Sequence, residues 1–65
     1  MTDVRVYSDS TLVGFQPVSD AAREWFAENV ESEPWQWMGG VLWCDARPAQ
    51  ALVEGLAAEG FNLGN

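Results

Sequence analysis

The sequence predicts a small α+β domain in which an antiparallel-type sheet of three or four strands packs with two helices, in the order β-β-α-β-α-β. Three observations predict it. Short β-prone runs separated by turn residues lie near the N-terminus, two later segments carry apolar residues at helical spacing, and an apolar run separates those segments. With 65 residues, the chain should form one compact domain spanning 1–65, which buries only ~60% of its unfolded surface.

The first element expected is a β-hairpin. Val4 to Tyr7 is short and β-prone, and the following Ser8 to Ser10 is turn material. Thr11 to Phe15 has the composition of a second strand. Pro17 keeps the residue before it extended, so the chain should leave this strand without entering a helix at once.

The first helix should begin after Ser19, a good N-cap, and run to about Glu31, where Ser32, Glu33 and Pro34 end it. At ~100° per residue, one side of this helix is expected to face the core. That side carries Val18, Ala22, Trp25, Phe26, Asn29 and Val30.

The second half of the chain should supply a buried strand and a second helix. Residues 35–37 are an irregular aromatic stretch, and residues 38–40 are expected to form a flexible or bulged entry. The following segment, Val41 to Cys44, has the composition of a central strand that is covered on both sides. The helix that follows has an apolar stripe and should end at Gly60 in the left-handed conformation, before a short strand at 61–63. The expected core comprises Trp25, Phe26, Val41, Trp43, Leu52 and Leu56.

The charge balance restricts the function. Ten acids face three arginines, with no lysine or histidine, so the net charge is -7. Affinity for nucleic acid depends on Lys and Arg neutralising phosphates, so direct nucleic-acid binding is not expected. An anionic membrane would also repel the chain, and no apolar run is long enough to span one. Basic protein surfaces are the expected partners.

The residues needed for most enzyme mechanisms are missing. Without histidine, neither a Ser-His-Asp nor a Cys-His set can form. The single Cys44 allows no internal disulfide, which fits a reducing cytosol, and it reads as a small buried apolar residue. Zinc ligands and a calcium-binding loop are also lacking. We therefore expect a protein that is not an enzyme, with no catalytic residue, metal site or cofactor.

The first helix carries the most informative pattern, a row of acids at spacings of four, four and three: Asp20, Glu24, Glu28 and Glu31. These carboxylates fall within an arc of about 80° and follow one another every ~5–6 Å. That is close to the spacing of phosphates along a nucleic-acid strand, ~6–7 Å. The row has two interpretations: the solvated face of an amphipathic helix, or a phosphate-like surface for a basic partner.

Three further residues close to the row are candidate partner contacts. Glu33 adds another carboxylate, and Trp35 and Trp37 could form an aromatic patch beside the acids, since Trp is frequent in binding hot spots. The alternative is that both tryptophans belong to the core or to a lid over it.

A pattern of helix caps and core positions extends over residues 11–61: Phe15, Pro17, Ser19, Ala22, Trp25, Asn29, Trp37, Gly39, Leu42, Arg47, Leu52, Leu56 and Gly60. In this pattern the sequence resembles the small proteins of phages and prophages, and within them the anti-CRISPR proteins, closest to inhibitors of the type I-C system. The resemblance implies a phage-encoded inhibitor in the cytoplasm of a bacterial host, of a kind in which several members mimic DNA. It transfers no catalytic residue.

The leading hypothesis is thus a monomeric, non-enzymatic inhibitor. Its acidic surface would mimic DNA and block recognition of target DNA and of the PAM by a CRISPR effector, with the PAM-reading large subunit as the expected partner. One alternative is an anti-restriction DNA mimic with a different basic target. Another is a structural or accessory phage protein whose acids only give solubility and whose tryptophans mediate self-association. A third is an antitoxin-like partner of a basic toxin.

Overall fold

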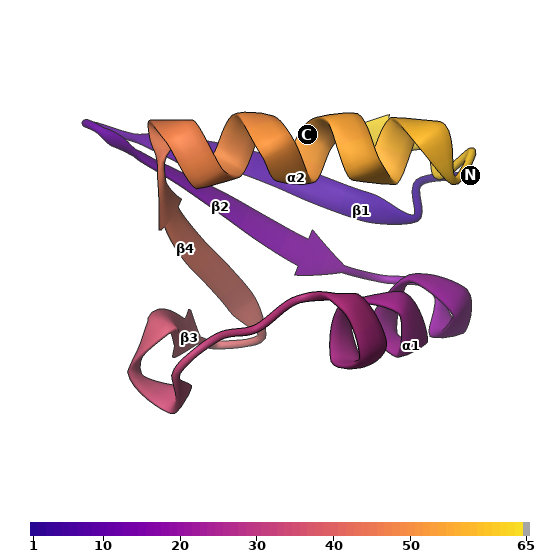
Figure 1. Cartoon of the computed structure of the whole chain (residues 1–65), viewed down its shortest axis with the longest axis horizontal. Helices are drawn as coiled ribbons and strands as arrows, with labels where there is room; N and C mark the ends of the chain where they lie inside the picture. Colours follow the sequence, from indigo (N-terminus) through magenta and orange to yellow (C-terminus); the bar gives the residue numbers. More distant parts are fainter. Residues whose placement is uncertain (65) are drawn as a thin grey trace.

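The computed structural model describes residues 1–64 and confirms the α+β class. A five-stranded sheet and two helices form one unit (Figure 1). The elements in chain order are β1 (Val4–Asp9), β2 (Leu12–Pro17), α1 (Asp20–Asn29), the 3₁₀ turn η1 (Pro34–Gln36), β3 (Trp37–Met38), β4 (Val41–Asp45), α2 (Ala46–Ala58) and β5 (Leu63–Gly64).

The sheet has the strand order β3-β4-β2-β1-β5. All neighbours are antiparallel except β5, which runs parallel to β1. The five strands exceed the three or four expected, because β3 forms where the sequence suggested only an irregular entry. Gly39 and Gly40 have φ values of 58° and 80°, as in the type I′ turn that closes a two-residue hairpin. The glycine pair thus builds a β3–β4 hairpin.

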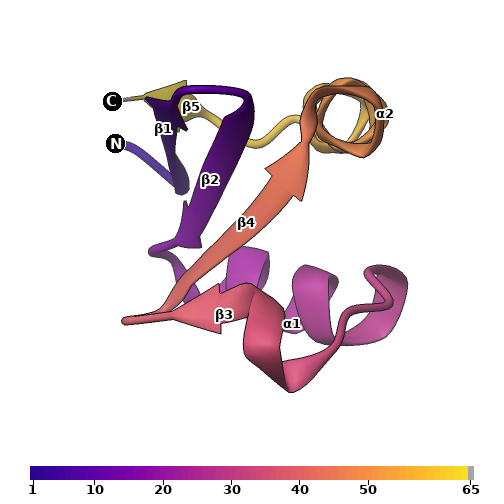
Figure 2. The same ribbon diagram turned by 90° about the vertical axis from the view of Figure 1, so that its left-hand side faces the viewer.

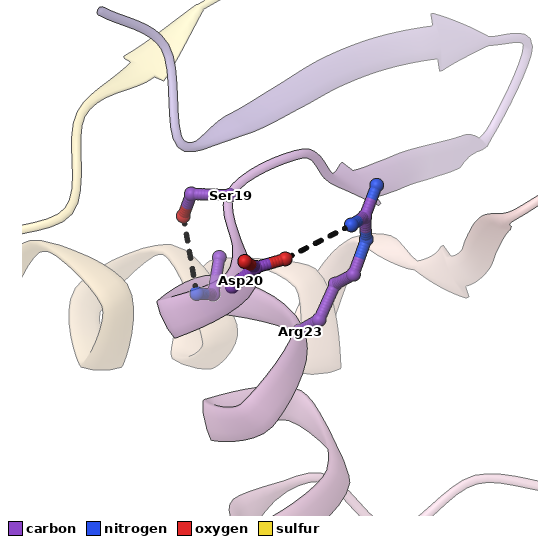
Figure 3. Close-up of polar contacts among 4 residues, drawn as sticks. Ser19, Asp20 and Arg23 are labelled. Carbon is purple, nitrogen blue, oxygen red and sulfur yellow. Dashed lines mark hydrogen bonds and ion pairs between the residues drawn. The ribbon is translucent and has the colours of Figure 1, made fainter.

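Helix α1 begins as expected and ends early. The Ser19 hydroxyl accepts a hydrogen bond from the Ala22 N–H at 3.1 Å, which caps the first turn (Figure 3). The helix stops at Asn29, because Val30 adopts an extended backbone (φ -110°, ψ 115°) while its side chain packs against the core. The expected extension to Glu31 is therefore wrong, and Glu31 lies outside the helix.

Helix α2 ends as the sequence predicts. Gly60 has φ 83°, and the N–H groups of Gly60 and Phe61 donate to the carbonyls of Ala57 and Leu56 at 3.0 and 3.2 Å. These two bonds define a Schellman motif, which uses a left-handed glycine to satisfy the last carbonyls of a helix. The Phe61 ring then folds back onto Trp25, with centroids 6.2 Å apart and an edge-on orientation.

The core lies on one face of the sheet, between the strands and both helices. Figure 2 shows the two helices apart from each other on the same side of the twisted sheet. The buried cluster takes side chains from three strands and both helices: Val4, Phe15, Ala22, Phe26, Leu42, Cys44, Ala49 and Leu56. Of the six expected core residues, Phe26 and Leu56 are buried, and Trp25 and Leu52 are half-buried against the cluster.

The other two expected core residues, Val41 and Trp43, lie elsewhere. They alternate with the buried Leu42 and Cys44 along β4, so they occupy the face that the helices leave uncovered, and both are half-buried. The expectation that β4 is covered on both faces is wrong, because both helices pack on the same face. Val41 and Trp43 instead shield Gly14 of the neighbouring strand.

Gly14 leaves room for these two side chains. A Cβ at Gly14 would lie 2.8 Å from the Val41 Cγ1 and 2.9 Å from the Trp43 Cζ3. We predict that Gly14→Ala destabilises the protein by about 1–3 kcal/mol, as overpacking does. This exceeds the roughly 0.4–1 kcal/mol that alanine gains by restricting the unfolded chain. Urea unfolding measures the change, and a variant as stable as the wild type would show that Trp43 moves aside freely.

Asp3 connects three segments of the chain. Its N–H donates to the Asn62 carbonyl at 2.8 Å, and its carboxylate accepts from the Asn62 N–H at 2.9 Å. Its own carbonyl accepts from the N–H groups of Val18 and Ser19. The backbone N–H of Asn62, followed by the Ser19 side chain, stabilises the carboxylate and holds the pKa of Asp3 below its usual value.

This lowered pKa predicts an acid-sensitive contact. The stabilisation is complete above the unfolded-state pKa of about 3.9 and disappears as the pH falls through the lower folded-state pKa. Asp3→Asn should therefore lower stability at pH 7 slightly and flatten its loss below about pH 4. Urea midpoints at neutral and acidic pH measure both effects. Parallel pH curves for the two proteins would contradict this role of Asp3.

Candidate functional site

The exposed face of α1 carries three carboxylates of the predicted row, those of Asp20, Glu24 and Glu28. The opposite side of the same helix buries Ala22 and Phe26 in the core. We call these three acids the α1 row. As expected, they are solvent-exposed, and successive members are one helical turn apart, a rise of ~6 Å.

One cation lies beside the α1 row. The Arg23 Nη1 contacts the Asp20 Oδ1 at 3.3 Å, with both side chains largely exposed (Figure 3). An exposed i,i+3 pair of this kind contributes little to stability. Among residues 1–64, Glu24 and Glu28 form no ion pair. The negative charge of the row is thus concentrated at these two residues.

The remaining two predicted acids, Glu31 and Glu33, lie in the segment between α1 and η1, and both are exposed. Glu33 begins the 3₁₀ turn, and its N–H donates to the Gln36 Oε1 at 2.9 Å. Because Val30 leaves the helix, Glu31 does not continue the α1 row by helical spacing. Of the predicted acids, Asp20, Glu24 and Glu28 therefore lie on the helix, and Glu31 and Glu33 lie on the segment that follows it.

Trp35 and Trp37 have different environments. Trp35 is 78% exposed, whereas Trp37 is half-buried, with its ring edge-on to Phe26 at a centroid distance of 6.2 Å. The Trp37 Nε1 donates to the Ser32 Oγ at 2.8 Å. Trp37 thus packs against the core, as the alternative interpretation expected, and only Trp35 presents most of its ring to solvent.

A cleft of about 810 Å³ lies beside Trp35. Its lining residues come from α1 and the segment after it, from η1, β3 and β4, from the end of the β1–β2 hairpin and from the first half of α2. The lining residues are mainly apolar: Asp9, Leu12, Trp25, Asn29, Val30, Glu31, Trp35, Gln36, Met38, Leu42, Trp43, Cys44, Asp45, Pro48, Ala51 and Leu52.

Of the residues that line the cleft, the sequence predicted only Glu31 and Trp35 as partner contacts. Strand alternation was the signal that could have placed Trp43 on the face opposite Leu42 and Cys44. Met38 was expected in a flexible or bulged entry, and it is 67% exposed and lines the cleft. An exposed methionine next to a tight turn is consistent with a contact surface.

The chemistry available in this site is limited. Cys44 is buried, and desolvation, followed by the nearby Asp45 charge, raises the pKa of its thiol, so it stays protonated at neutral pH. Within residues 1–64, no three His, Cys, Asp or Glu side chains come together to hold a metal ion. Neither helix of that part of the chain has the length and apolarity needed to cross a bilayer.

Three features of the protein therefore bear on its function: the α+β fold, the α1 row and the cleft. Comparison of the chain with models of known families, with curated proteins and with solved structures found no match.

Proposed function

We propose that this protein is a non-enzymatic inhibitor that binds a basic, DNA-recognising surface of another protein through the α1 row. The observation that supports the proposal is a pair of exposed carboxylates, those of Glu24 and Glu28, which form no ion pair within residues 1–64. They lie one turn apart on a helix whose other side packs in the core. The helix fixes the backbone beneath these charges, so little backbone freedom is lost on binding, whereas each glutamate side chain loses rotamer freedom.

The overall charge favours such a partner. A net charge of -7 with no lysine attracts basic surfaces over a distance of about a Debye length, ~8 Å at physiological ionic strength. Electrostatic attraction accelerates association more than it adds affinity, because exposed ion pairs are weak. The remaining affinity would come from a few apolar contacts near the row.

The resemblance to anti-CRISPR proteins suggests the first target to test, the PAM-reading large subunit of a type I-C effector. The carboxylates would take the place of DNA phosphates there and block target binding. An anti-restriction protein would use the same surface on another basic target, so the mechanism is shared and the partner differs.

The test measures competition. Purified effector should bind the protein directly, and increasing protein should displace a labelled target duplex that carries the PAM. Both effects should weaken as salt rises, while the protein alone should shift no duplex at physiological salt. Absence of competition at low salt would rule out this target, and DNA binding by the protein alone would contradict the charge argument.

A further inference from the structure

The cleft runs along a free edge of β4. It touches Leu42 and Cys44, which face the core side, and also Trp43 and Asp45, which face the opposite side. Because successive side chains of a strand point to opposite faces, a cavity contacts both sets where it passes the edge or the end of the strand. β3 pairs with β4 no further than Leu42, so no strand of residues 1–64 pairs with this edge from Trp43 onward, and the turn η1 lies beside β4.

The hydrogen-bonding pattern leaves the backbone of Trp43 unpaired at this edge. The β3–β4 hairpin closes on the pair Met38–Val41 around a two-residue turn, so the N–H and C=O of Val41 point toward β3. Backbone groups alternate in direction along a strand, so those of Leu42 point to β2 and those of Trp43 point back toward the cleft. No strand of residues 1–64 pairs with Trp43 on that side.

Apolar side chains gather around this edge. Five large apolar residues are exposed within residues 1–64, and three of them line the cleft. These three are Leu12, Trp35 and Met38, whose exposed fractions are 38%, 78% and 67%. Singly exposed apolar residues are common on protein surfaces, but a group of them around one cavity is typical of a binding site. An unpaired strand edge among apolar side chains is the arrangement that proteins use to bind an extended peptide as an added strand.

The charges around the cleft indicate which kind of molecule binds there. Asp9, Glu31 and Asp45 line it, and none of its lining residues is basic. Asp9 and Asp45 share the face of the sheet that carries Trp43, by strand alternation and the register of β1, β2 and β4. A second copy of this chain would bring acids against acids, so charge complementarity favours a basic segment of a different protein.

We propose that the cleft binds an extended, basic segment of a partner protein, which adds as a strand to the free edge of β4. Alternate apolar side chains of the segment enter between the helices, toward Leu42, Cys44 and Leu52. The intervening basic side chains face Asp9 and Asp45. The free edge from Trp43 to Asp45 is ~10 Å long, enough for about three residues of an added strand. This site is separate from the α1 row and does not depend on it.

A defined peptide tests the proposal. The probe is a short synthetic peptide in which valine and lysine alternate, blocked at both ends, and its control replaces every lysine with glutamate. In the free protein the Trp43 amide should exchange with deuterium faster than the Cys44 amide, which bonds to β2. Saturation with the basic peptide should slow exchange at Trp43 about tenfold and leave Cys44 nearly unchanged. The acidic peptide should not bind.

Two matched variants locate the binding. Ala51 and Ala58 are both exposed on α2, and only Ala51 lines the cleft. Ala51→Arg adds bulk and a positive charge to the cleft, and Ala58→Arg adds the same group outside it. Arginine is a good helix former, so both variants should fold. Ala51→Arg should weaken peptide binding about tenfold or more, and Ala58→Arg should change it less than about twofold.

Several results would overturn the proposal. Equal binding by both variants, without protection of the Trp43 amide, would mean that the peptide binds elsewhere, for example on the α1 row. A Trp43 amide that is already protected in a dimer detected by sedimentation would make a second copy the occupant. Absence of binding by the basic peptide at low salt would show that this edge does not accept an added basic strand.

Discussion

Leu56→Ala is expected to lower the free energy of unfolding by about 2–5 kcal/mol, the cost of removing a fully buried leucine side chain. Leu56 is 0% exposed and lies on α2 within the single core cluster of the domain. A domain of this size has roughly 3–10 kcal/mol of stability in total, at about 0.05–0.15 kcal/mol per residue. The substitution should therefore remove a large share of it.

Thermal and urea unfolding measure this loss. For domains of this size, each kcal/mol corresponds to a shift in Tm of roughly 4–8 °C, so the variant should melt far below the wild type. Leu12→Ala provides the matched control, since Leu12 is 38% exposed in the hairpin and should lose much less. An unchanged Tm for Leu56→Ala would contradict the packing of α2 on the sheet.

The features that the sequence predicted correctly depend on local interactions. Ser19 caps α1 through an N–H three residues away, and Gly60 ends α2 through bonds within the same turn. The exposure of Glu24 and Glu28 follows from helical periodicity alone. Such patterns are complete within a few residues, so they can be recognised before the tertiary structure is known.

The features that were missed depend on contacts between distant segments. β3 has two residues, too few for a recognisable pattern, and it exists because β4 supplies the hydrogen bonds. The last strand was expected at 61–63 and lies at Leu63–Gly64, where it pairs with β1. The apolar run at Val41–Cys44 gave no sign of which face the helices would cover. The cleft exists because the chain enters β3 only at Trp37, after the turn η1, so no strand of residues 1–64 pairs with β4 beside Trp43.

The early end of α1 has the same origin. In an ideal helix that continued to Glu31, Val30 would lie on the apolar side and Glu31 would lie in the row of acids. Val30 still packs against the core, but from an extended backbone. Tertiary packing thus changed the backbone, and Glu31 lines the cleft, as Trp35 does, instead of continuing the α1 row by helical spacing.

The double change Glu24→Lys and Glu28→Lys is expected to abolish inhibition while leaving the fold intact. Both side chains are exposed, so no core contact is lost. Two lysines at i,i+4 repel each other as two glutamates do, so this pair should change the stability of the helix by no more than a few tenths of a kcal/mol. The reversed charges would repel a basic partner surface, and its association rate should fall by about tenfold or more.

The matched control is Glu54→Lys with Glu59→Lys. These acids are exposed at α2 and its C-cap, outside the α1 row and the cleft. Each substitution changes the charge by +2, so either pair takes the net charge from -7 to -3. If net charge alone attracts the partner, both double variants should lose binding equally. If the α1 row makes the contact, the α2 pair should retain most of it.

Partner affinity and inhibition should be measured for the wild type and both double variants at two salt concentrations, with circular dichroism to verify folding. Wild-type binding should weaken as salt rises, because counterions screen exposed charges. The α1-row variant should bind weakly at both concentrations, since its favourable attraction is gone. A folded α1-row variant that inhibits as well as the wild type would mean that these acids are only solvated. Contacts would then be sought at the cleft, beginning with Trp35.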